Sequence, residues 1–178
     1  HKQRKMKKVG IIGGSGYTGG ELIRLVLRHP ALALDFVFST TRPETPLCHT
    51  HVDLLGSTEM NFTDTINPEV DVVFLCVGHG KSVGFLEKNQ FSEQTIIIDL
   101  SNDFRLKNDA QFQDYDFVYG LPEYQKTKIE SAKAIANPGC FATAIQLALL
   151  PLAKENLIKD ALHVNATTGS TGAGVGLS

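Results

Sequence analysis

The sequence has few cysteines, no long apolar run and no concentrated basic surface. Its three cysteines lack regular spacing, which argues against a disulfide framework and favours a reducing cytoplasm. The longest apolar run, 70–77, contains Asp71 and is far too short to span a membrane. The net charge is −2 and the basic residues are dispersed apart from a run at 1–5, so nucleic acid is not indicated as a partner. These absences leave an ordinary globular chain that we expect to be cytoplasmic, with no membrane or nucleic-acid partner.

The two ends of the chain have unusual compositions. Residues 1–5 read His-Lys-Gln-Arg-Lys before Met6. We interpret them as the remnant of an expression tag rather than a targeting arm, because no apolar segment of secretory-signal length follows. The chain stops in the glycine-rich segment 172–178 with no closing helix or strand. We therefore expect a piece of a longer protein, with one domain and part of another.

Short apolar segments alternate with helical patterns along the chain. The apolar segments predict strands at 8–13, 32–39, 70–77, 94–100, 116–123, 132–136 and 161–168. The periodicity of three and four predicts helices at 21–28, from 82 through about 88, and at 141–154. Strands alternating with helices predict an α/β fold with a Rossmann-like, doubly wound, mostly parallel sheet.

A glycine-rich turn connects the first predicted strand to the first helix. Gly13, Gly16 and Gly19 have the spacing Gly-x-x-Gly-x-x-Gly. A strand, a glycine turn and a helix in this order place a pyrophosphate on the N-terminus of the helix. The alternative is a glycine turn with only a structural role. The predicted cofactor-binding residues of this turn are Gly13, Ser15, Gly16, Tyr17, Thr18 and Gly19.

The end of the second predicted strand distinguishes between the two nicotinamide cofactors. An acidic residue at this point usually holds the ribose of NAD, but the chain has Ser39, Thr40 and Arg42 in its place. Hydroxyl groups and a guanidinium suit a 2′-phosphate, which an acid would repel. We therefore predict NADP(H) as the cofactor. The alternative is a solvated loop in which Arg42 only faces water.

Two further loops follow predicted strands and reach the same edge of a parallel sheet. Gly78 and His79 follow the strand at 70–77, and we expect them to line the cofactor cleft, although a turn-exposed histidine is an equal alternative. Ser101 and Arg105 follow the strand at 94–100. Arg105 suits a phosphate or a carboxylate, and the alternative is a loop held by an internal Asp–Arg pair.

One short cluster contains residue types that bind metals but lacks the ligand spacing of a structural zinc site. Cys48, His49 and His51 lie within four residues. Structural zinc sites usually need a distant fourth ligand and a closed second shell. We therefore expect a solvated loop and no metal.

A cysteine begins the last predicted helix. Asn137 and Pro138 indicate a turn, and Gly139 allows the backbone to pass close to a neighbour. Cys140 then lies where unpaired N–H groups and the positive end of the helix dipole favour a thiolate nucleophile. The alternative is a small buried cysteine packed at a helix start.

Four motifs in this order resemble the N-acetyl-γ-glutamyl-phosphate reductase family, a relative of aspartate-semialdehyde dehydrogenase. They are Gly-Gly-Ser-Gly-Tyr-Thr-Gly-Gly-Glu-Leu at 13–22, Asp-Leu-Ser-Asn-Asp-Phe-Arg-Leu at 99–106, Tyr-Gly-Leu-Pro-Glu at 119–123 and Ala-Asn-Pro-Gly-Cys-Phe-Ala-Thr at 136–143. The resemblance covers the chain from Met6 to its end. It implies an enzyme of arginine biosynthesis that reduces an acyl phosphate with NADPH and releases phosphate.

The resemblance also implies roles for residues and domains. Cys140 would be the catalytic nucleophile that forms a thioester, and the histidine that assists it lies beyond residue 178. We expect a cofactor domain at 6–154, the start of a truncated α+β substrate domain at 155–178, and a homo-oligomer for the full-length protein. The expected substrate-binding residues are Ser101, Arg105, Asn137, Ser170 and Gly172.

The segment around 169–174, where relatives usually carry a lysine and Ser-Gly, departs from the family pattern, since the chain reads Thr-Thr-Gly-Ser-Thr-Gly at 167–172. Residues 1–178 alone are expected to be inactive. The alternatives are another acyl-phosphate or semialdehyde dehydrogenase of the same superfamily, and a non-catalytic module that senses NADP.

Overall fold

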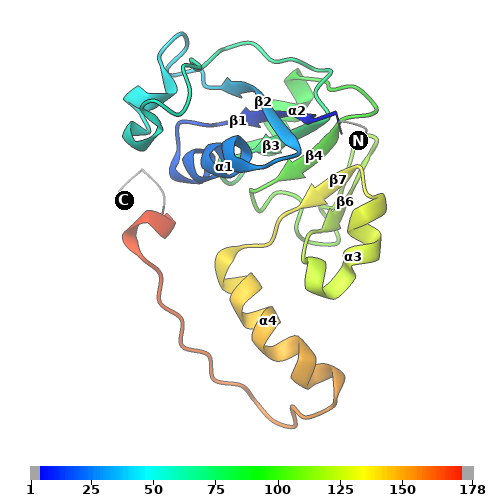
Figure 1. The fold of residues 1–178 in the computed structure, drawn as a ribbon. Coiled ribbons are helices and arrows are strands. Elements are labelled where there is room, and N and C mark those ends of the chain that lie inside the picture. The colour runs from blue at the N-terminus through cyan, green and yellow to red at the C-terminus, as the bar shows by residue number, and fades with distance from the viewer. Residues whose placement is uncertain (1–4, 174–178) are drawn as a thin grey trace.

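A single sheet of seven strands forms the centre of the molecule (Figure 1). The computed structural model describes residues 5–173; residues 1–4, which belong to the run that we interpreted as a tag remnant from the sequence, and residues 174–178 lie outside the described residues. The strands are β1 (Lys7–Ile12), β2 (Leu32–Phe38), β3 (Val72–Leu75), β4 (Ile96–Asp99), β5 (Gln111–Phe112), β6 (Tyr115–Tyr119) and β7 (Ala134–Ala136). The helices are α1 (Tyr17–Arg28), α2 (Ser82–Lys88), α3 (Pro122–Ser131) and α4 (Cys140–Lys154), with 3-10 turns η1 (Leu47–His49), η2 (Val52–Leu54) and η3 (Ser170–Ala173).

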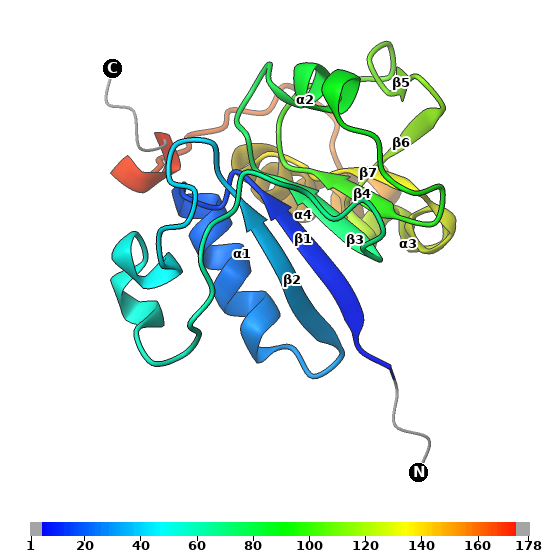
Figure 2. The same ribbon diagram turned by 90° about the horizontal axis from the view of Figure 1, so that it is seen from above.

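The strand order is β2-β1-β3-β4-β7-β6-β5, and every neighbouring pair is parallel except β5 with β6. The chain places β2 on one side of β1 and β3 on the other, so the strand order reverses beside β1. Figure 2 shows β1 and β2 running side by side in one direction with α1 next to them. The prediction of a Rossmann-like, mostly parallel sheet is confirmed. Ligands of such sheets bind beyond the carboxyl ends of the strands, where the order reverses.

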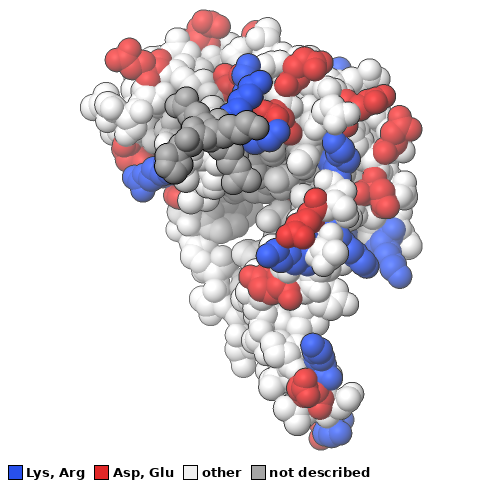
Figure 3. Space-filling model, turned by 45° about the vertical axis from the view of Figure 1, so that its right-hand side comes forward, with Lys and Arg blue, Asp and Glu red and all other residues white. Residues whose placement is uncertain are grey.

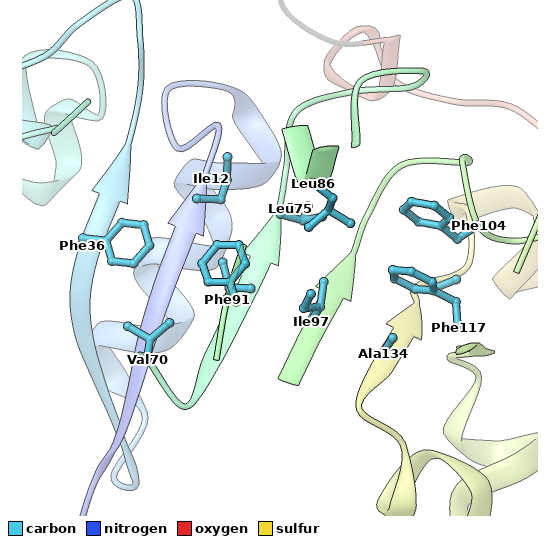
Figure 4. Packing of buried hydrophobic residues seen from close by; sticks show 12 residues of the cluster. Ile12, Phe36, Val70, Leu75, Leu86, Phe91, Ile97, Phe104, Phe117 and Ala134 are labelled. Atoms are coloured by element: carbon cyan, nitrogen blue, oxygen red, sulfur yellow. The ribbon is translucent and has the colours of Figure 1, made fainter. Parts of the chain in front are cut away.

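Hydrophobic clusters lie on both faces of the sheet around β1, because successive side chains of a strand point to opposite faces. On β1, Val9 and Ile11 pack with Ile23 of α1. Ile12 belongs to the other cluster, which includes Leu86 of α2. Figure 4 shows this second cluster, with side chains from β1, β2, β3, β4, α2 and β7 lying along one face. The core therefore holds the strand ends, and the loops that follow them, in fixed positions.

The last part of the chain projects from the sheet (Figure 1). No residue of α4 is buried, although most of its side chains are apolar. Figure 3 shows few charged side chains on this projecting part except near its tip. The strand predicted at 161–168 is wrong: this stretch is exposed and makes no strand pairing with the rest of residues 5–173. A strand needs the backbone groups of a neighbouring strand, and the described residues offer none there.

One α-helix and one strand were not predicted from the sequence. α3 carries no buried residue and contains a break at Gln125, whose φ and ψ are −144° and 45°. It therefore lacks the apolar period by which a helix is recognised. β5 has only two residues and pairs antiparallel with the adjacent β6, so its strand character comes from a local hairpin.

Candidate cofactor and thiol site

The turn after β1 passes so close to its neighbours that side chains are excluded. Gly13 has a φ of +79°, and a Cβ there would lie 2.4 Å from the carbonyl oxygen of Cys76 after β3. A Cβ on Gly19 would lie 2.6 Å from the Cα of Gly14. The N–H groups of Gly13 and Gly14 donate to the carbonyl of Phe38, at 3.0 and 3.3 Å. The glycine turn is thereby fixed to the ends of β2 and β3.

The first turn of α1 leaves its backbone N–H groups free of side-chain caps. The N-cap is Gly16, which has no capping side chain, and the first turn carries no acidic residue. Tyr17 and Thr18 are exposed there, next to the half-buried Ser15. Because this end carries the positive end of the helix dipole, the turn fits the pyrophosphate of a dinucleotide. The structure brings together all six residues predicted for this turn.

The residues predicted for the 2′-phosphate lie immediately beyond β2. Ser39 is buried, its N–H donates to the carbonyl of Thr63, and its hydroxyl lies 3.2 Å from the hydroxyl of Thr41. Thr40 and Arg42 are exposed. Within residues 5–173, no carboxylate lies within ion-pair distance of Arg42. The guanidinium and the Thr40 hydroxyl are therefore groups of this loop that a phosphate can reach.

Asp103 joins the loops that follow β3 and β4. One of its carboxylate oxygens accepts the N–H of Gly80 at 2.6 Å. The other accepts the N–H groups of Ser82 and Val83, at 2.9 and 3.3 Å, at the start of α2. His79 lies in the same loop, and its Nδ1 accepts the N–H of Asn102 at 3.0 Å. His79 is therefore exposed on a loop whose position is stabilised by the loop that follows the neighbouring strand, β4.

A buried carboxyl lies beneath these two loops. Asp99, at the end of β4, is fully buried and accepts the hydroxyls of Ser82 and Ser101, at 2.5 and 2.6 Å. Burial raises the pKa of Asp99 above its ordinary value, although the two hydroxyl donors act in the opposite direction. The predicted substrate residue Ser101 is itself buried, with its hydroxyl also accepting the N–H of Asp103.

Arg105 reaches from the β4 loop to the cysteine turn. Its Nε donates to the carbonyl of Asn137 at 2.8 Å, and its Nη2 donates to the carbonyl of Leu100 at 2.9 Å. A Cβ on Gly139 would lie 3.0 Å from the Nη1 of Arg105. Cys140 follows as the first residue of α4 and is exposed. The structure therefore places a guanidinium beside the turn that carries an accessible thiol.

Two predicted substrate residues lie apart from this group. Ser170 and Gly172 are exposed in η3, and the N–H of Gly172 donates to the carbonyl of Gly169 within the same segment. Among residues 5–173, no hydrogen bond connects Ser170 or Gly172 to the loops at the strand ends. The segment that precedes them, 163–167, lines a hollow with the side of α4.

The cluster at 48–51 is not the solvated loop that was expected. His49 is exposed, but His51 is buried and its Nε2 lies 2.7 Å from the carbonyl oxygen of Gly14. Nothing in the local sequence distinguishes the two histidines, so this contact was missed. Across the described part of the chain, no three His, Cys, Asp or Glu side chains gather in a way that could hold a metal ion. Cys76, just after β3, is half-buried, and burial raises the pKa of its thiol to about 12.

The sequence profile described as "Semialdehyde dehydrogenase, NAD binding domain" matches residues 8–132, and the one described as "Semialdehyde dehydrogenase, dimerisation domain" matches residues 140–178. The chain belongs to the semialdehyde dehydrogenase family. The first of these matches contains the glycine turn, and the second begins at Cys140.

Individual members of the semialdehyde dehydrogenase family are also similar to the chain. It is 65% identical to the N-acetyl-gamma-glutamyl-phosphate reductase of Flavobacterium johnsoniae and 57% identical to that of Christiangramia forsetii, over 97% of this chain and 53% of each relative. The chain thus spans about half the length of these curated relatives. The fold is similar to that of aspartate semialdehyde dehydrogenase with NADP from Candida albicans, with a TM-score of 0.55, 16% identity, and coverage of 86% of this chain and 48% of that one.

No helix within residues 5–173 is both long and apolar enough to cross a membrane.

Proposed function

We propose that the chain carries the cofactor- and thiol-bearing part of an NADPH-dependent N-acetyl-γ-glutamyl-phosphate reductase. The observation that carries this proposal is the exposed Cys140 at the start of α4, which follows β7 at the same edge of the sheet as the glycine turn. The names of its relatives support the choice of substrate. The reaction reduces N-acetyl-γ-glutamyl phosphate to N-acetylglutamate semialdehyde and releases inorganic phosphate.

The thiolate of Cys140 attacks the acyl carbon of the substrate. A carbon–sulfur bond forms, the carbon–oxygen bond to the phosphate breaks, and inorganic phosphate leaves. When bound, NADPH supplies the hydride that reduces the carbonyl carbon of the thioester. The carbon–sulfur bond then breaks, which yields the semialdehyde and regenerates the thiolate. The N–H groups at the start of α4 stabilise negative charge on the carbonyl oxygen.

The other residues bind and orient the two ligands. The glycine turn and the uncapped start of α1 hold the pyrophosphate, and Arg42 with Thr40 holds the 2′-phosphate. The free edge of the Arg105 guanidinium faces the cysteine turn and binds the phosphate of the substrate. Two hydrogen bonds to backbone carbonyls hold Arg105 in that orientation before the substrate arrives.

The test of the nucleophile uses a chain that contains both halves of the enzyme. We expect Cys140→Ser to lower acyl-phosphate reduction by more than about a thousandfold while the Kd for NADPH changes by less than about twofold, because the hydroxyl is a far weaker nucleophile and lies outside the glycine turn. Cys48→Ser is the matched control and should retain activity. Normal turnover by Cys140→Ser would disprove the thioester mechanism.

Two alternatives predict other results. A semialdehyde dehydrogenase of the same superfamily with a different acyl chain would require Cys140 but would prefer another acyl phosphate. A module that only senses NADP would bind NADPH and be unaffected by Cys140→Ser. Acyl-phosphate reduction by the chain that contains both halves separates the sensor from the enzymes, because a sensor binds NADPH but does not oxidise it.

We further propose that the whole protein is a cytoplasmic homo-oligomer, which the name of the dimerisation-domain profile supports. The domain boundary expected at residue 154 stays a prediction.

A further inference from the structure

We propose that His51 is a positioning residue that orients and polarises the Gly14–Ser15 peptide of the glycine turn for the cofactor phosphate. This inference rests on the proposed binding of NADP(H). His51 is 37 residues from Gly14 in sequence, and only 8% of its surface is exposed. Its Nε2 lies 2.7 Å from the Gly14 carbonyl oxygen. Since a carbonyl oxygen only accepts, Nε2 carries the proton of this hydrogen bond.

The position of the His51 ring is determined by its surroundings. A Cβ on Gly20 would lie 2.5 Å from Cε1 and 2.6 Å from Nδ1 of His51, so the ring packs directly against the backbone of α1. Phe62, which is also buried, lies on another side, with ring centroids 6.4 Å apart. The ring therefore has little freedom to turn away from Gly14.

A second contact holds the same segment to α1. Asp53, two residues beyond His51, accepts two hydrogen bonds from Arg24 of α1, at 2.5 and 2.6 Å. A bidentate pair of this kind constrains distance and orientation together. The 3-10 turns η1 and η2 are thus attached to α1 through Arg24 and to the glycine turn through His51.

The hydrogen bond to Gly14 determines where the next N–H group points. The Gly14–Ser15 peptide is trans, since the described chain contains no cis peptide bond. In a planar trans peptide the C=O and N–H bonds point in opposite directions. The His51 ring holds the Gly14 carbonyl on its own side, so the Ser15 N–H points away from it. Ser15 N–H makes no hydrogen bond to residues 5–173, which leaves it available to an anion.

The hydrogen bond from His51 to the Gly14 carbonyl also makes the Ser15 N–H a stronger donor. Donation to a carbonyl polarises the amide and makes its N–H a better donor, because hydrogen bonds in a chain reinforce one another. The expected ligand group is the pyrophosphate of the dinucleotide, which approaches the uncapped start of α1 immediately after Ser15. His51 acts on this group through the peptide and does not touch it.

The experiment measures the Kd for NADPH of residues 1–178 by NADPH fluorescence. His51→Leu removes the donor that holds the peptide and should raise the Kd about three- to tenfold, less than the loss of a whole hydrogen bond to a charged group, because the Ser15 N–H itself remains. His51→Gln can place an amide N–H near the same carbonyl and should stay within about threefold of wild type. His49→Leu changes the exposed neighbour in η1 and is the matched control, with an unchanged Kd.

Thermal unfolding identifies variants that do not fold. NMR of the wild-type chain then tests whether the Ser15 amide binds the cofactor. Saturating NADPH should shift the Ser15 amide proton downfield, while the Gly10 amide in the middle of β1 stays in place. An unmoved Ser15 amide, or equal Kd values for wild type and a folded His51→Leu, would overturn the role of His51 alone. Failure of the wild-type chain to bind NADPH would overturn the proposed function and this inference with it.

Discussion

Asp103 provides a sharp test of how the two loops beside the site are held. Its carboxylate accepts N–H groups of Gly80, Ser82 and Val83, at 2.6, 2.9 and 3.3 Å. α2 has no cap of its own, because its N-cap residue Lys81 makes no capping hydrogen bond. Asp103 therefore caps α2 from the neighbouring loop. Asp103→Ala would leave these N–H groups to water.

The loss of stability expected for Asp103→Ala can be estimated from these contacts. Loss of a side-chain cap costs about 0.5–2 kcal/mol, and a hydrogen bond to a charged group contributes about 1.5–3 kcal/mol. The third contact is long, and the exposed Gly80 can exchange its partner for water. We therefore expect Asp103→Ala to lower the free energy of unfolding by about 1–2 kcal/mol. For a chain of this size that corresponds to a fall in Tm of about 2–8 °C.

Urea denaturation and hydrogen exchange test this expectation separately. Amide exchange at Ser82 and Val83 should become about tenfold faster if the lost cap opens the start of α2. Asp103→Asn keeps an acceptor oxygen and should show roughly half the loss. Asp109→Ala, an exposed aspartate whose side chain makes no hydrogen bond within residues 5–173, is the control. Unchanged exchange at Ser82 and Val83 in Asp103→Ala would refute the cap.

Three further predictions concern the cofactor and the buried carboxyl. Arg42→Ala should raise the Kd for NADPH about tenfold or more and leave that for NADH within about threefold, because only the 2′-phosphate needs the guanidinium; equal losses in titrations with both cofactors would contradict this role. Gly19→Ala should abolish measurable NADPH binding, because its Cβ would meet the Cα of Gly14 at 2.6 Å; tight binding by the variant would show that the turn can move. Asp99 has a raised pKa through burial, so its contribution to stability is present at low pH and is lost as the pH rises from about 3.9 through that raised pKa. The unfolding free energy of wild type minus that of Asp99→Asn should therefore fall as the pH rises above about 4 in urea titrations, and a difference that grows with pH would contradict the raised pKa.

Much of the sheet could be predicted because its strands have strong local signals. The run at 70–77 is continuously apolar, and β3 forms within it as a central parallel strand. The start of α4 at Cys140 followed from the Asn-Pro-Gly turn before it. The prediction of a strand at 161–168 was wrong because local signals are not sufficient for a strand. Its composition favours an extended backbone, but a strand also requires a neighbour that residues 5–173 do not provide there.

The predicted site residues likewise divide into those with a local signal in the sequence and those that depend on long-range contacts. The glycines of the turn after β1 were found from their spacing, since close backbone approach excludes side chains at Gly13 and Gly19. The connections among the loops depend on long-range contacts instead. Arg105 was expected either to meet a ligand or to pair with a nearby aspartate, and the structure shows it bonded to the carbonyls of Leu100 and Asn137. No local pattern encodes such a choice of partner.

By itself, the sequence determined the alternation of strands and helices, the glycine turn and the cysteine at a helix start, because each depends on residues that are neighbours along the chain. Only the tertiary structure decided what holds these parts in place. His51 and His49 have the same side chain two residues apart, yet one is buried against Gly14 and the other is exposed. Their difference arises from the packing of η1 and η2 against α1, and such packing brings together residues that are distant along the chain.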